Sequence, residues 1–240
     1  MSKSVYLSAS NQPGNHGPNG YIEETEMHKL KDKTKKILVR HGLIVYTNEI
    51  GWTRTESIKD SNSKNPDAHV AFHSNASKDK KTQGTEIFYY HQTGPSSNSY
   101  KLASCLYKYI APISPGPQDR GILPDNAYFK QLDEIQSTKA SAALTEYFFH
   151  TSPEDVNHWY THIDAYATAT AIGILEYFGI KYVPPSNEPE YIAKMRKSGV
   201  DMVREWCEAV DFAVKLSSTQ GNEKLKIFAY FPELIKKIKG

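Results

Sequence analysis

The sequence predicts an α/β fold, in which a mostly parallel mixed sheet is flanked by helices and followed by a small all-helical C-terminal module. Two observations predict it. Over residues 1–182, short apolar runs of strand character alternate with segments that have the apolar period of a helix. A polar, proline-rich stretch at 183–190 then precedes further helical patterns. We therefore expect a main domain over 1–182, a linker over 183–190 and a helical C-terminal domain over 191–240.

Each element of the main domain has its own signal. Strand character, from β-branched and aromatic residues, predicts strands at 5–8, 43–47, 68–72, 86–90 and 142–145. Helical periodicity predicts helices at 25–41, 99–110 and 153–178. The polar segment 57–67 is interpreted as a helix end and a loop, and 112–121 as an irregular connection. These assignments bring the ends of several strands to one edge of a sheet.

The composition excludes some classes of partner. Lys and Arg number 29 against 27 Asp and Glu, and the basic residues are scattered, so there is no electrostatic footprint for nucleic acid or an anionic membrane. No apolar stretch approaches the ~18 residues that span a bilayer, and no secretory signal is visible at the start. With only two cysteines, a disulfide framework is not expected. We expect synthesis in the cytoplasm.

Polar and ionisable residues follow several of the predicted strands, where α/β proteins gather function. His73 ends an apolar alternation, and Glu23 and Glu24 open the first helix. Imidazole nitrogen and carboxylate oxygen are ligands for zinc, although a histidine at a strand end can be structural and carboxylates at a helix start are favoured by its dipole. Glu146 lies among apolar residues, so it must be paired, protonated or functional.

Five stretches occur in an order that resembles the zinc-dependent N-acetylmuramoyl-L-alanine amidases of the type 3 family, found in bacterial autolysins and phage endolysins. The resemblance covers roughly residues 4–182. The stretches are Glu24 at a helix start, HSNA at 73–76, GTEIFYY at 84–90, RG at 120–121 and LTEYFF at 144–149.

This resemblance implies a set of site residues. One zinc ion would be held by Glu24 and His73, with Glu146 as the catalytic carboxylate, while Asn75 and Arg120 would bind substrate. Glu24 is preferred over its neighbour Glu23 because Met27 and Leu30 then fall at the family's inward helix positions.

The chain departs from the family at the first zinc ligand, which is usually a histidine. Here Asn11 or Gln12 stands at that position. Either Gln12 binds through its amide oxygen, or His16 folds back from the glycine-rich loop. Zinc prefers imidazole nitrogen, which favours His16, whereas alignment to the strand end favours Gln12.

The resemblance also implies the reaction, which is hydrolysis of the amide bond between N-acetylmuramic acid and L-alanine in bacterial cell-wall peptidoglycan. The alternatives are a catalytically inactive wall-binding homologue and a zinc carboxypeptidase. The C-terminal helices are expected to bind the wall or to associate into a homo-oligomer. Without a signal peptide, the protein would reach the wall by release through a holin or by mother-cell lysis.

Overall fold

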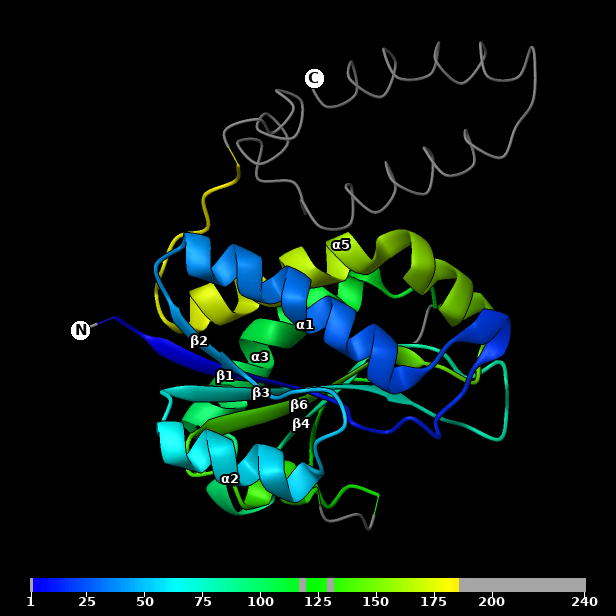
Figure 1. Ribbon diagram of the computed structural model, residues 1–240. Helices are drawn as coiled ribbons and strands as arrows, with labels where there is room; N and C mark the ends of the chain where they lie inside the picture. The colour runs from blue at the N-terminus through cyan, green and yellow to red at the C-terminus, as the bar shows by residue number, and fades with distance from the viewer. Residues whose placement is uncertain (1, 117–119, 129–131, 186–240) are drawn as a thin grey trace. The chain divides into compact units, whose positions relative to one another are not determined.

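The computed structural model describes residues 2–116, 120–128 and 132–185. Six strands form one sheet in the order β2-β1-β3-β6-β4-β5, with helices on both faces (Figure 1). The strands are β1 (Ser4–Ala9), β2 (Ile44–Thr47), β3 (Ala68–Asn75), β4 (Glu86–Tyr89), β5 (Ile122–Pro124) and β6 (Ser141–Phe149). The helices are α1 (Glu23–Arg40), α2 (Arg54–Lys64), α3 (Asn98–Ile110), α4 (Asp133–Gln136) and α5 (Pro153–Tyr177), with 3-10 turns η1 (Pro18–Gly20), η2 (His91–Thr93) and η3 (Ala111–Ile113). The predicted α/β fold is confirmed for the described domain.

Strand direction determines which residues reach the edge that carries the site. β2, β1, β3 and β6 run parallel, whereas β4 is antiparallel to β6 and β5 is parallel to β4. Because β4 is reversed, its first residue, Glu86, pairs with Glu146 of β6. The start of β4 therefore joins the carboxyl ends of β1, β3 and β6.

One face of the sheet is covered by α1, α3 and α5, and the other by α2 (Figure 1). Aromatic side chains fill the first face, where Trp159 of α5 stacks on Phe148 of β6 with ring centroids 4.8 Å apart. The Trp159 Nε1–H also donates to Glu26 of α1 over 3.0 Å, which joins the two helices. A Cβ atom at Gly173 of α5 would lie 2.9 Å from the backbone of α3, so the two helices approach closely only because this residue is glycine.

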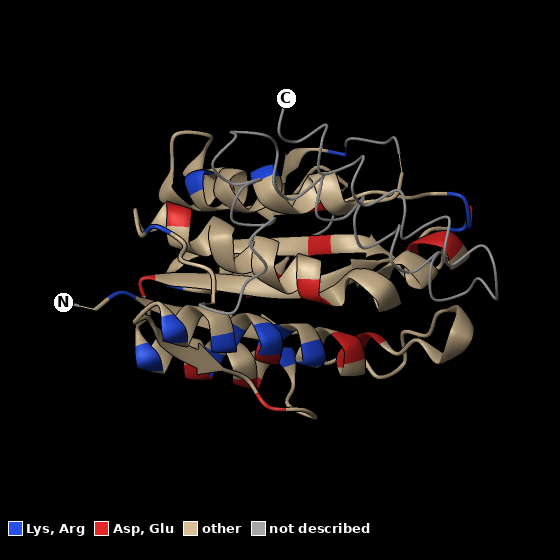
Figure 2. Cartoon of the chain, turned by 90° about the horizontal axis from the view of Figure 1, so that it is seen from above, with Lys and Arg blue, Asp and Glu red and all other residues tan. Residues whose placement is uncertain are grey.

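The first helix shows how sequence sets local structure. The first turn of α1 contains three glutamates and its last turn contains Arg40, as the helix dipole favours. Figure 2 shows this change from acidic to basic residues along α1. Apolar and polar side chains that face the sheet are buried, among them Glu23, Met27 and Leu30.

The polar segment at 57–67 is mostly helix rather than a helix end and loop. Thr53 and Glu56 form a capping box at the start of α2, and Asn65 ends the helix in the left-handed conformation. The buried residues of α2 are Ser57 and Ser61, so this helix presents small polar side chains inward and lacks the apolar period that would reveal it.

Two further elements, β5 and α4, lie after the irregular connection at 112–121, in a stretch for which the sequence predicted no element. The strands β3 and β6 extend past their predicted ends to Asn75 and Phe149. The predicted C-terminal domain, 191–240, and most of the linker lie outside the described residues. Within the described ranges, no helix combines the length and apolar character that crossing a membrane requires.

Candidate active site

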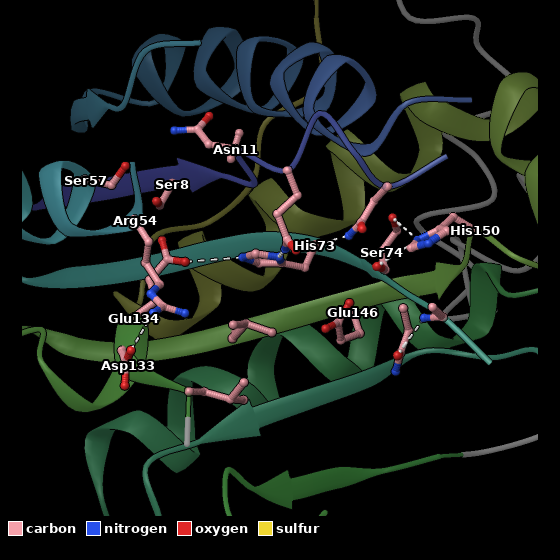
Figure 3. Close-up of a pocket in the computed structure, with 17 residues that line it drawn as sticks. Ser8, Asn11, Arg54, Ser57, His73, Ser74, Asp133, Glu134, Glu146 and His150 are labelled. Atoms are coloured by element: carbon pink, nitrogen blue, oxygen red, sulfur yellow. Dashed lines mark hydrogen bonds and ion pairs between the residues drawn. The ribbon is translucent and has the colours of Figure 1, made fainter. Parts of the chain in front are cut away.

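A pocket of about 390 Å³ opens at the carboxyl edge of β1, β3 and β6. His73 of β3 and Glu146 of β6 both line it and are paired in the parallel register, so their side chains lie next to each other on one face of the sheet. Figure 3 shows the two residues on neighbouring strands, with Glu134 approaching His73 from the opposite wall. Two of the predicted site residues are thus brought together.

Glu23 of α1 lies against His73 and is fully buried. Its Oε1 atom is 3.1 Å from His73 Nδ1, and its Oε2 accepts a hydrogen bond of 2.7 Å from the Asn15 amide. Burial alone would raise the pKa of the Glu23 carboxyl, but the hydrogen bonds and charge of His73, together with the Asn15 bond, hold that pKa below its ordinary value. Glu23 is therefore a buried carboxylate in contact with His73.

Glu24 lies away from this group, so the expected contact between Glu24 and His73 is absent from the structure. Its Oε1 accepts from the Gly51 N–H over 3.3 Å instead. Successive residues on a helix point about 100° apart, so only one of the pair can face His73. Met27 and Leu30 lie four and seven residues after Glu23, so Glu23 fits the same inward helical period for which Glu24 was preferred.

Of the two candidates for the first ligand, Gln12 is the one beside His73. Its side-chain amide nitrogen lies 3.3 Å from His73 Nδ1, and its oxygen accepts from the Asn15 amide over 3.1 Å. His16 instead pairs with Ile22 in an isolated backbone bridge. Within residues 2–116, 120–128 and 132–185, no group of three His, Cys, Asp or Glu side chains is arranged to hold a metal ion.

The far side of the His73 ring meets Glu134, a residue that the sequence analysis missed. His73 Nε2 lies 3.2 Å from Glu134 Oε2. Burial alone would lower the pKa of His73, but hydrogen bonds with Glu134 and Glu23 outweigh it and raise that pKa well above its ordinary value. The imidazole is thus held between two carboxylates. Glu134 belongs to α4, which spans four residues and carries no periodic signal.

Asn75 and Arg120 meet at Glu86, next to Glu146. The Asn75 amide and Arg120 Nε both donate to the Glu86 carboxylate, the latter over 3.0 Å. The Arg120 guanidinium also lies 4.7 Å from the centre of the Phe149 ring. A second hollow of about 260 Å³ adjoins the pocket, because Asn75 and Glu146 line both.

The donor atoms around His73 can be compared with the ligands that zinc accepts. Glu23 and His73 supply a carboxylate oxygen and an imidazole nitrogen, both of which zinc accepts, from positions 3.1 Å apart. The third neighbour, Gln12, turns its amide nitrogen to His73, and an amide nitrogen does not bind zinc, so its oxygen, which accepts from Asn15, would have to face the metal instead. An amide oxygen is a weaker donor than the imidazole that zinc prefers. With that change, the donor set fits zinc with two strong ligands and one weak ligand.

Comparison with known proteins supports one family. Residues 9–176 match the family model for N-acetylmuramoyl-L-alanine amidase. None of the curated proteins compared with the chain matches it in sequence. Among solved structures, the catalytic domain of the amidase CwlV from Bacillus (Paenibacillus) polymyxa var. colistinus is 24% identical with a TM-score of 0.65, and covers 75% of this chain and 99% of its own.

Two further structures have the same fold. The amidase AmiC2 of Nostoc punctiforme is 19% identical with a TM-score of 0.66, and the match covers 75% of this chain and 99% of that one. The catalytic domain of CD27L, an endolysin that targets Clostridia difficile, is 20% identical with a TM-score of 0.60, over 73% of this chain and 98% of that one. At these identities the structures establish the fold alone.

Proposed function

The chain belongs to the N-acetylmuramoyl-L-alanine amidase family, and from this premise we propose that it hydrolyses the bond between N-acetylmuramic acid and L-alanine of peptidoglycan with one zinc ion. The observation that carries the proposal is that Glu23 contacts His73, which lines one pocket together with Glu146, in a chain that matches the family over residues 9–176. Membership of this enzyme family agrees with the sequence prediction. Zinc and the individual roles are the proposal.

Glu23 and His73 would hold the zinc ion, with the amide oxygen of Gln12, once turned towards the metal, as the third and weakest ligand. Glu23 replaces Glu24 in this proposal because only Glu23 contacts His73. A zinc ion bound there would act as a Lewis acid on the scissile carbonyl and lower the pKa of the attacking water towards ~7. Asn15 would keep the Glu23 carboxylate in place through its 2.7 Å hydrogen bond.

Glu146 would serve as general base and then as general acid. Its side chain lies on the same sheet face as that of His73, at the paired position of the adjacent strand, and lines the same pocket. There it can take a proton from the attacking water and deliver it to the leaving nitrogen. Asn75 and Arg120 would bind the substrate from the adjoining hollow, which Glu146 also lines.

The test uses the full-length chain on purified peptidoglycan, with detection of new N-terminal alanine. For Glu146→Gln we expect turnover to fall about 10²- to 10⁴-fold with the fold and the bound metal unchanged, because only a proton-transfer group is lost. Glu154→Gln, an exposed glutamate in the first turn of α5, is the matched control and should keep wild-type activity. Undiminished wall hydrolysis by the Glu146 variant would refute this role.

A catalytically inactive wall-binding homologue is the second candidate, and the amide of Gln12 at the third ligand position favours it. Metal content separates the two. The enzyme should retain about one equivalent of zinc after dialysis and lose activity to a chelator, whereas the inactive homologue should bind walls without releasing alanine. Release of a C-terminal amino acid instead would identify a carboxypeptidase.

The route to the wall is a further part of the proposal. We propose release from the cytoplasm, through a holin or by mother-cell lysis, as the route by which the protein reaches peptidoglycan. Expression of the chain alone should then leave cells intact, and permeabilising the inner membrane should start lysis. Lysis without permeabilisation would contradict this route.

A further inference from the structure

We propose that Glu134 is a positioning residue, which orients the His73 ring so that Nδ1 faces the metal. The inference rests on the proposed zinc site and adds a residue that neither the sequence nor the family comparison indicated. The two nitrogens of the His73 ring face different neighbours. Nδ1 is 3.1 Å from Glu23 Oε1 and 3.3 Å from the Gln12 amide, whereas Nε2 is 3.2 Å from Glu134 Oε2.

Only one ring nitrogen can bind a metal while the other carries a proton. The second strong donor, Glu23, and the amide of Gln12 both lie on the Nδ1 side. Nδ1 is therefore the ligand atom, and Nε2–H donates to Glu134. A carboxylate in this position fixes the tautomer and the ring orientation of a ligating histidine and increases its strength as a ligand.

Glu134 is well placed to be rigid. It is 5% exposed, and its second oxygen, Oε1, lies 3.5 Å from Nε2 of His69. His69 is fully buried on β3, four residues before His73 and on the same face of the strand. It stacks on Tyr6 with the rings 4° from parallel, and its Nδ1 lies 2.9 Å from the Ser61 hydroxyl of α2. The carboxylate is thus fixed by the same strand that carries the ligand.

The weak third ligand gives Glu134 its importance. With an amide at Gln12 in place of an imidazole, zinc affinity depends mainly on Glu23 and His73. Any disorder in the His73 ring would then cost affinity directly. Glu134 limits this disorder from the one side of the ring that the metal does not use.

The adjacent residue offers a matched control. Asp133 precedes Glu134 in α4 and lines the same pocket, but its carboxylate pairs with Arg54 at 2.6 Å and is 45% exposed. Figure 3 shows Asp133 directed to Arg54, while Glu134 is directed to His73. Substitution of either residue removes one negative charge from the same wall, but only Glu134 contacts the His73 ring.

The experiment measures zinc affinity of the full-length chain by competition with a chromophoric chelator at one fixed pH. We expect Glu134→Ala to weaken zinc binding about 10- to 100-fold. Glu134→Gln should recover part of the lost zinc affinity, because its amide oxygen can still accept a hydrogen bond from Nε2–H. If Glu134 acted only through its negative charge, the Gln variant would lose as much affinity as the Ala variant. Asp133→Ala should bind zinc within about twofold of wild type, since it touches no ligand.

Circular dichroism and thermal melting of each variant check the fold. If Glu134→Ala does not fold, the comparison of Glu134→Gln with Asp133→Asn decides, and the former must bind zinc more weakly. Wild-type affinity in the Glu134 variants, or an equal loss in the Asp133 variants, would overturn the positioning role alone. A wild-type chain that takes up no zinc would overturn the proposed metal site as well, so the two failures are distinguishable.

Discussion

The carboxyl end of β1, from which the Gln12 loop departs, depends on Asn48, and replacing this residue tests that dependence. Asn48 is fully buried just after β2. Its Oδ1 accepts from the Ala9 N–H over 2.9 Å, and its Nδ2 donates to the Ala9 carbonyl over 2.8 Å. The side chain thus supplies Ala9 with the two hydrogen bonds that a neighbouring strand would otherwise provide.

Asn48→Ala would leave both backbone groups of Ala9 without these partners at a position that is 3% exposed. A buried group without a partner costs about 1–3 kcal/mol, so the two groups together predict a loss of about 2–6 kcal/mol in the free energy of unfolding. The measurement is urea unfolding followed by circular dichroism, with the slopes checked for equality between variants.

Asn62→Ala is the control, because Asn62 makes the same kind of double contact in a solvent-exposed setting. It donates to the Ser137 carbonyl over 2.9 Å and accepts from the Lys139 N–H over 2.8 Å. Water can replace these bonds, so we expect a loss of only about 0.5–1.5 kcal/mol. Equal losses for the two variants would refute the reasoning, since burial is what distinguishes them.

Three further predictions follow from the fold and the site. Gly173→Ala should lower stability by about 1–3 kcal/mol, because its Cβ would lie 2.9 Å from the α3 backbone, whereas Gly14→Ala, with open space around it, should leave the melting temperature unchanged. Burial, and then a neighbouring lysine, lower the pKa of His28 to about 4, so the unfolded chain binds more protons below about pH 6.5, and stability should fall between about pH 6.5 and 4. His28→Gln should lose less over that interval in urea titrations, and an identical loss would remove His28 as the cause. Gln12→His should bind zinc more tightly than wild type in the chelator competition, while Gln92→His at an exposed position should not.

The sequence predicted most of the fold because its strands and long helices carry strong periodic signals. His73 was found for the same reason, since a polar residue that ends an apolar alternation marks the end of a buried strand. The sequence favoured Glu24 over Glu23, but residues one position apart fit the same inward period when the first turn of the helix is not known. In the structure Glu23, not Glu24, contacts His73, and only the tertiary fold carries this information.

Glu134 lay beyond sequence reasoning for a different reason. It belongs to a four-residue helix without an apolar face, and its partner His73 is 61 residues away in the chain. The polar helix α2 was missed because its inward residues are serines, one of which, Ser61, contacts the buried His69 of β3. Local sequence patterns do not reveal such polar contacts between residues that are far apart in the chain.

The order of the strands also determines how late in synthesis the sheet can be completed. β3 and β4 follow one another in the chain, yet β6 lies between them in the sheet. Until residue 149 has been made, these two strands each have an edge without its final neighbour, and such edges are prone to aggregation. We expect nascent chains that stop before β6 to need chaperones, and folding to be slow because its pairings span long stretches of chain.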